Sequence, residues 1–153
     1  MILNYAYKLS LYRNEVYLSM AASVLCIIDF SESSRKALQW AIAHAATHKS
    51  HLTVLYPYRL TRAQYGESAI ALRKKIEEEA HKSFQLLEQD LLANQKISYD
   101  FKTEVGFIAD RVEEHTKRHP VIFMVINKSI RKGNRESFDE LVEDTEIPLV
   151  IIP

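Results

Sequence analysis

Residues 24–41, VLCIIDFSESSRKALQWA, contain the transition that decides the fold. The first five residues are apolar without interruption, as in a strand that is buried on both faces of a sheet. An aspartate and a serine-rich turn follow, and then Ala37, Leu38 and Ala41 recur at the spacing of a helix with one buried face. A buried strand that leads through a short polar turn into an amphipathic helix is typical of an α/β protein.

The same alternation continues to the end of the chain. Further strand candidates follow at residues 52–56, 97–105, 121–126 and 148–152. Helical spacing extends through residues 33–47 and recurs at 67–93, 107–118 and 138–145. Strands that alternate with helices form parallel crossover units, so we expect an open parallel five-stranded sheet with helices on both faces. No linker interrupts residues 23–153, which we assign to one domain.

Residues 1–22 precede this pattern, and we predict that they form an N-terminal extension. Tyr5, Tyr7 and Leu9 alternate with smaller or polar residues at strand spacing, so an appended strand is one interpretation and a disordered leader is another. A third is that Met20 is the functional start. The segment has no basic head before its apolar residues, which argues against a signal peptide.

The charge composition argues against a general attraction to polyanions. The 153 residues contain 20 Lys and Arg and 20 Asp and Glu, so no net field would collect nucleic acid or an anionic membrane. No apolar run approaches the roughly 18 residues of a membrane-spanning helix. The single cysteine, Cys26, lies inside the first apolar run, where we interpret it as a core residue. We therefore expect a cytoplasmic protein without nucleic-acid or membrane partners.

The turn after the first strand candidate is the first place to look for a ligand. Open parallel sheets bind ligands beyond the carboxyl ends of their strands. Ser31 is placed to cap the following helix, whose free N–H groups can receive an anion. Capping alone also explains the serines. Asp29 is harder to explain in that way, because a carboxylate directly after a buried strand faces the crevice unless a backbone donor binds it.

Several segments, in their order along the chain, resemble the universal stress protein (UspA-like) family. Residues 24–41 resemble the family's first strand, serine-rich turn and alanine-rich helix, and residues 52–56, 105–112 and 148–152 resemble its second, third and closing strands. The resemblance covers residues 23–153. It implies a sheet in the order 3-2-1-4-5, frequent homodimers and a role in stress resistance. One branch of the family binds ATP through a loop of the form G-x2-G-x9-G-[ST], and the other branch lacks this loop.

The corresponding segment here, NKSIRKGNRES at residues 127–137, departs from that pattern. Val125 and Lys128 stand where the first two glycines belong, and Gly133 followed by Asn134 is the nearest counterpart of the last glycine and hydroxyl residue. A phosphate loop needs glycine because its backbone N–H groups must approach the oxygens without a Cβ in the way. We interpret the segment as a degenerate phosphate loop that serves as a connection.

The predicted degenerate crevice also includes Pro57, because the family usually has histidine and then valine where this chain has Tyr56 and Pro57. We expect no cofactor. The alternative is an adenine-nucleotide-binding module that holds ATP or AMP with Asp29 and the 127–137 loop. The spacing of Ser137 and Glu140 also fits a capping box, in which a helix satisfies its own first N–H groups. The full set of crevice candidates is Asp29, Ser31, Pro57, Val125, Lys128, Gly133 and Asn134.

Catalytic and metal signals are weak. His44 and His48, and likewise His115 and His119, are four residues apart on predicted helices, but zinc requires three or four converging ligands. No G-x-S-x-G motif is present, and no serine has a partner histidine by spacing. We predict neither a metal site nor an enzyme.

The closing strand candidate is apolar on both faces and consists of Leu149, Val150, Ile151 and Ile152. In the family's strand order it lies at an edge of the sheet, and an uncovered apolar edge favours pairing with another copy. We expect a homodimer through this strand. The sequence therefore predicts a stress-response domain that acts through dimerisation and protein partners, without tight ATP binding.

Overall fold

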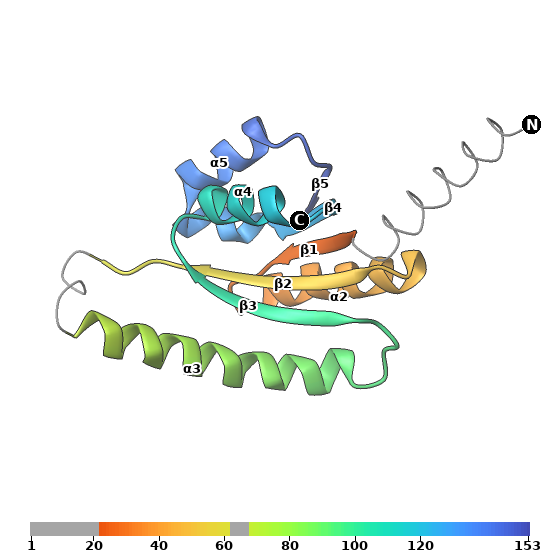
Figure 1. The fold of residues 1–153 in the computed structure, drawn as a ribbon, viewed down its shortest axis with the longest axis horizontal. Helices are drawn as coiled ribbons and strands as arrows, with labels where there is room; N and C mark the ends of the chain where they lie inside the picture. Colours follow the sequence, from red (N-terminus) through yellow and green to blue (C-terminus); the bar gives the residue numbers. More distant parts are fainter. Residues whose placement is uncertain (1–21, 62–67) are drawn as a thin grey trace, which may run out of the picture.

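The structure, a computed structural model, describes residues 22–61 and 68–153. Within these residues, five parallel strands form one sheet in the order β3-β2-β1-β4-β5, which confirms the predicted order (Figure 1). The strands are β1 (Ser23–Ile27), β2 (His51–Tyr58), β3 (Tyr99–Val105), β4 (Val121–Asn127) and β5 (Leu149–Ile152). Except for Ala22, which is buried, the predicted extension lies outside the described residues.

Helices cover both faces of the sheet, as predicted (Figure 1). On one face lie α2 (Glu32–His48) and α3 (Ala69–Leu87), which continues into a π-helical turn, η2 (Glu88–Leu92). On the other face lie α4 (Ile108–Arg118) and α5 (Arg135–Asp144), and a 3-10 helix, η3 (Lys128–Gly133), joins β4 to α5. No helix of the described residues is long and apolar enough to cross a membrane.

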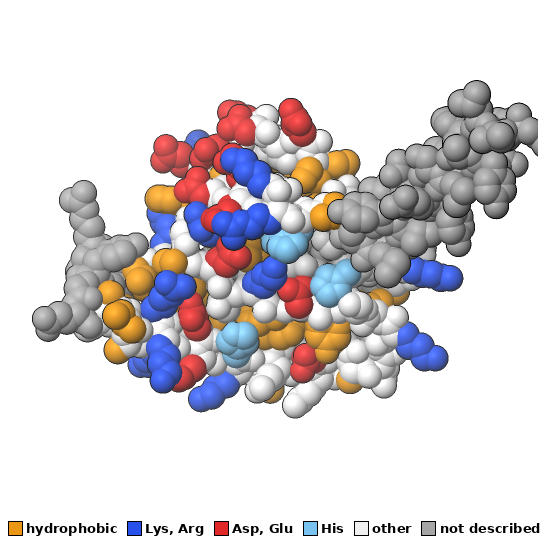
Figure 2. Space-filling view, in the orientation of Figure 1, with side chains coloured by type: hydrophobic (Ala, Val, Ile, Leu, Met, Phe, Trp, Pro, Cys, Tyr) orange, Lys and Arg blue, Asp and Glu red, His pale blue; other side chains and the backbone are white. Residues whose placement is uncertain are grey.

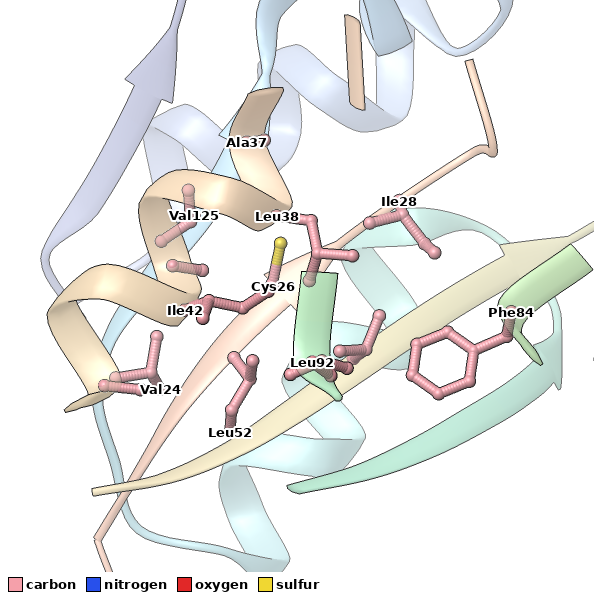
Figure 3. Packing of buried hydrophobic residues seen from close by; sticks show 13 residues of the cluster. Val24, Cys26, Ile28, Ala37, Leu38, Ile42, Leu52, Phe84, Leu92 and Val125 are labelled. Atoms are coloured by element: carbon pink, nitrogen blue, oxygen red, sulfur yellow. The ribbon is translucent and has the colours of Figure 1, made fainter. Parts of the chain in front are cut away.

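The two core layers follow from the alternation of side chains along the strands. Val24 and Cys26 of β1 belong to one buried cluster with Leu38 of α2 and Phe84 of α3 (Figure 3). Leu25 and the residues that alternate with it face α4 and α5. Cys26 is fully buried, which confirms its predicted place in the core. Burial raises the pKa of its thiol far above the ordinary value, so the thiolate nucleophile does not form.

The predicted capping box before the last helix is wrong. Helix α5 begins at Arg135, two residues before Ser137, and its N-cap residue Asn134 makes no side-chain capping bond. Ser137 lies inside the helix and is buried, and its hydroxyl oxygen accepts a hydrogen bond from the backbone N–H of Ala109. This serine therefore connects α5 to α4.

Candidate functional site

A crevice of about 580 Å³ opens at the carboxyl ends of β1, β2 and β3. Its walls include Asp29 after β1, Pro57 in β2, Gly106 after β3 and Asn134 before α5. Ligands of open parallel sheets bind in this position. Three of the predicted crevice residues, Asp29, Pro57 and Asn134, therefore line one hollow.

The Asp29 carboxylate is exposed and is partly used by the turn that follows it. Its Oδ1 accepts hydrogen bonds from the backbone N–H of Ser31 at 2.9 Å and from the Ser31 hydroxyl at 2.5 Å. The Ser31 oxygen in turn accepts the N–H of Ser34 at 3.1 Å and so caps α2, as expected. A backbone donor therefore explains part of the placement of Asp29, and Oδ2 accepts no hydrogen bond from the residues that the structure describes.

Phe30 is held in the left-handed region, with φ of 63°, between Asp29 and Ser31. Such a conformation is unfavourable for a bulky residue, and aromatic packing offsets its cost. The Phe30 ring meets Tyr56 edge to face, with centroids 4.9 Å apart, and it meets Phe101 in the same way at 5.9 Å. Burial, followed by the negative charge of Asp29, raises the pKa of Tyr56, so this crevice residue is a neutral phenol at physiological pH.

The other predicted crevice residues do not converge on this hollow. Val125 lies within β4, as the strand candidate at residues 121–126 predicted, and it is in register with Cys26 and Val150. Its side chain is fully buried, so it does not line the crevice. Lys128 lines a separate hollow of about 400 Å³ beside η3. Gly133 is exposed at the end of η3.

Several polar groups of the connection from β4 to α5 bond within the chain, whereas Nδ2 of Asn127 and the Ser129 hydroxyl are buried without a partner among the described residues. The Asn127 side-chain oxygen accepts the N–H of Ser129 at 2.8 Å, and the N–H of Asn134 donates to the carbonyl of Arg131 at 3.1 Å. Arg131 also holds Asp139 through two hydrogen bonds of 2.8 and 3.0 Å. Gly133 lacks the positive φ that would require glycine. This connection thus differs from a loop whose backbone donors surround a phosphate.

Phe107 and Arg59 are among the crevice residues that were not predicted from the sequence. Phe107 is 49% exposed after β3, and the guanidinium carbon of Arg59 lies 4.8 Å from the centre of its ring. Both line the crevice. The sequence signal for Phe107 was its position directly after Gly106 at a strand end, where crevice residues occur.

The structure also joins a serine, a histidine and an aspartate that sequence spacing did not connect. The Ser98 hydroxyl lies 2.6 Å from Nδ1 of His51, and Nε2 of His51 lies 2.8 Å from Oδ1 of Asp100. The same Asp100 oxygen accepts the hydroxyl of Thr53 at 2.8 Å. These residues lie at the amino ends of β2 and β3, opposite the crevice, so this hydrogen-bonded row ties two strand starts together.

His115 and His119 lie close together on α4 and just beyond it, with ring centroids 4.7 Å apart. His115 is buried, and burial, with smaller effects of Lys102 and His119, lowers its pKa to about 4. Among residues 22–61 and 68–153, no group of three or more histidine, cysteine or acidic side chains is arranged to hold a metal ion.

The predicted interface strand, β5, lies at the edge of the sheet beside β4. Val150 and Ile152 pack against the core that α2 covers, and Leu149 packs against the opposite core. Ile151 is 40% exposed. The four interface candidates therefore differ in how far they are available to a second copy.

An open parallel sheet in this order, with a crevice beyond its carboxyl ends, defines a doubly wound α/β domain. The sequence matches the universal stress protein family over residues 20–153, so the chain belongs to this family. A search of curated protein sequences gave no match.

Solved structures of the family share the fold at low sequence identity. Universal stress protein UspA from Lactobacillus plantarum is 18% identical, with a TM-score of 0.66 over 88% of this chain and 99% of that one. A family member from Burkholderia pseudomallei is 19% identical, with a TM-score of 0.66 over 88% and 98%. The universal stress protein from Archaeoglobus fulgidus in complex with dAMP is 12% identical, with a TM-score of 0.63 over 88% and 99%.

Proposed function

We propose that this protein is a non-enzymatic universal stress domain of the cytoplasm that acts in the stress response through self-association and protein partners, without tight binding of ATP. The observation that carries the proposal is the connection between β4 and α5. There the N–H groups of Ser129 and Asn134 bond within the chain, and Gly133 has no positive φ. A phosphate group would find fewer free backbone donors than a glycine-rich loop supplies.

Charge alone does not decide between the branches of the family. Glu136, in the first turn of α5, would repel a phosphate by about 4 kcal/mol at a separation of about 4 Å with an effective dielectric of 20. Lys128, Lys132 and Arg135 line the neighbouring hollow and offset much of that repulsion. The proposal therefore depends on the backbone geometry of the connection.

Self-association is supported by the exposed edge of the sheet. Among residues 22–61 and 68–153, strand β5 has a neighbour on one side only, and Ile151 of this strand has an exposed apolar side chain. Edge strands of this kind pair readily with a second copy. We propose a homodimer through β5, which would leave the crevice and the helical faces open to other partners.

Binding of an adenine nucleotide is the alternative function, and the crevice of about 580 Å³ favours it. Asp29 and the neutral phenol of Tyr56 line this hollow and could hold a sugar hydroxyl and a flat base. One structure similar to this chain, 14% identical with a TM-score of 0.61, is a universal stress protein in complex with cAMP. In this alternative the 127–137 segment would contact the phosphates.

Mass analysis of ligands retained by the purified protein separates the two functions. The protein is denatured, and the released small molecules are compared with those from a known nucleotide-binding protein. We expect no adenine nucleotide at a level comparable with the protein. Near-stoichiometric release of one would support the alternative, and phosphate release on incubation with ATP would indicate an enzyme.

A further inference from the structure

A second hollow, of about 470 Å³, lies between α4 and α5 and shares no lining residue with the crevice. Its floor is apolar: Val112 and Leu141 are buried, Ala109 lies beside them, and Ile147 is half-buried. The two helices lie side by side on the face of the sheet opposite α2 and α3 (Figure 1). We call this hollow the α4–α5 groove.

Carboxylates surround the apolar floor. Glu113, Glu140, Asp144 and Glu146 line the groove together with one cation, Lys117. Lys117 is already paired with Glu113 at 2.5 Å. The other three acidic side chains form no ion pair with any residue that the structure describes. Figure 2 shows acidic side chains gathered over α5.

This accumulation of negative charge is unfavourable within the chain itself. Residues 136–153 contain six acidic residues and no lysine or arginine, although the whole chain is neutral. Glu143 and Asp144 lie in the last turn of α5, where the negative end of the helix dipole disfavours each carboxylate by about 0.3–1 kcal/mol. Two carboxylates on α4 are paired instead, Glu113 with Lys117 and Glu114 with Arg118. Unpaired carboxylates at the end of a helix that disfavours them, with no contact that offsets the cost, are expected at a functional surface.

We propose that the α4–α5 groove binds a basic amphipathic helix of a partner protein. Apolar side chains of that helix, three or four residues apart, would enter the groove, and its lysines and arginines would meet Glu140, Asp144 and Glu146. The carbonyl end of α5 adds to the attraction for cations. The inference rests on the proposed function, because it names the class of protein partner and the surface that this partner uses.

The apolar floor distinguishes this occupant from a simple polycation. A polyamine would neutralise the rim but would make no apolar contact with the floor of the groove. A nucleic acid would be repelled, since its phosphates carry the same sign as the rim. An amphipathic basic helix matches both the floor and the rim.

Fluorescence anisotropy with a short labelled peptide tests the inference on the full chain at physiological salt. In the probe peptide, leucine recurs at helical spacing and lysine occupies the other positions. We expect saturable binding that weakens at least about tenfold when the same residues are scrambled so that no apolar face forms, and that is lost when glutamate replaces lysine. If the scrambled peptide bound equally well, or if spermidine displaced the labelled peptide as effectively as the unlabelled peptide does, the groove would bind by charge attraction alone. Either result would overturn the inference.

Two adjacent residues of α5 provide a matched pair of variants. Asp144 lines the groove and Glu143 does not. Asp144→Lys is expected to weaken peptide binding about tenfold, whereas Glu143→Lys, with the same change of charge, should weaken it less than about threefold. Neither variant should lower the melting temperature, because both remove a carboxylate from the last turn of a helix. An equal loss of peptide affinity in the two variants would contradict the assignment of the binding site to the α4–α5 groove.

The outcomes separate this inference from the function on which it rests. If the peptide does not bind, the groove is not the docking site. Self-association and the absence of retained nucleotide are still tested separately, by sedimentation velocity and by mass analysis. If the peptide binds and adenine nucleotide is also retained, the groove is supported and the proposed function is wrong in its treatment of ATP.

Discussion

The hydroxyl oxygen of Ser137 on α5 accepts a hydrogen bond of 2.9 Å from the backbone N–H of Ala109 at the start of α4. Both residues are buried. The first N–H groups of a helix have no partner within it, so this bond satisfies a donor that would otherwise be buried and unpaired. It also fixes the relative position of the two helices that form the α4–α5 groove.

Replacing Ser137 with alanine should lower the free energy of unfolding by about 1–3 kcal/mol, because the N–H of Ala109 loses its partner. The matched control is Ser129→Ala. The Ser129 hydroxyl is buried without a hydrogen-bond partner among the described residues, so its removal should be neutral or slightly stabilising. Urea denaturation measures both changes. A loss for Ser129→Ala equal to that for Ser137→Ala would contradict this assignment.

The two glycines of the described residues should respond differently to a Cβ. Gly106 has φ of +143°, and a Cβ there would lie 2.7 Å from Nε of Arg111, so Gly106→Ala should destabilise the fold by about 1–3 kcal/mol. Gly133 has no positive φ, and no atom lies within 4 Å of a Cβ added there. The free energy of unfolding of Gly133→Ala should therefore lie within about 0.5 kcal/mol of that of the unsubstituted protein. A large cost at Gly133 would show that the degenerate loop still requires its glycine. Thermal and urea unfolding provide the comparison.

His115 should make stability depend on pH. Its pKa is lowered from an ordinary 6.5 to about 4, so the unfolded chain takes up a proton more readily than the folded one across that interval. Stability is therefore complete above pH 6.5 and is lost as the pH falls towards about 4. The charged groups that act on this ring are Lys102, His119 and Asp100.

In His115→Leu the fall in stability over this interval should become shallower, whereas His48→Asn, at an exposed histidine of α2, should retain the original slope. Urea unfolding at a series of pH values measures the slope. An unchanged slope in His115→Leu would mean that other groups produce the acid sensitivity.

Self-association through β5 is tested by two substitutions at similar exposure. Ile151 is 40% exposed on the edge strand, and Val142 is 42% exposed on α5. Ile151→Lys should shift the protein towards monomer in sedimentation velocity at micromolar concentration, because a charge on an edge strand opposes pairing. Val142→Lys should leave the dimer intact. A monomer for the unsubstituted chain at this concentration would refute the proposed interface.

The fold was predictable because it depends on periodicity, which a sequence displays directly. The uninterrupted apolar run of β1 and the stripe on α2 indicated a covered parallel sheet, and the resemblance supplied its strand order. The positive φ of Phe30 was not predictable, because it depends on the rings of Tyr56 and Phe101 from neighbouring strands.

The crevice was predicted only in part for a similar reason. Asp29 and Pro57 follow strand ends, which sequence patterns locate well. Val125 was predicted within the fourth strand, and it was added to the crevice only because the family pattern has a glycine at this position. In the structure its side chain is buried, in register with Cys26. The contact between Ser98 and His51 joins residues 47 positions apart, which neither spacing nor motif could reveal.

Titration calorimetry with Mg-ATP tests the central claim most directly. The internally bonded connection between β4 and α5 predicts a dissociation constant no tighter than about 1 mM, which corresponds to about 4 kcal/mol of binding free energy. Asp110→Ala, at an exposed aspartate of α4 outside the crevice, is the control for Asp29→Ala. A micromolar constant that weakens in Asp29→Ala but not in Asp110→Ala would contradict the account and establish the crevice as a nucleotide site.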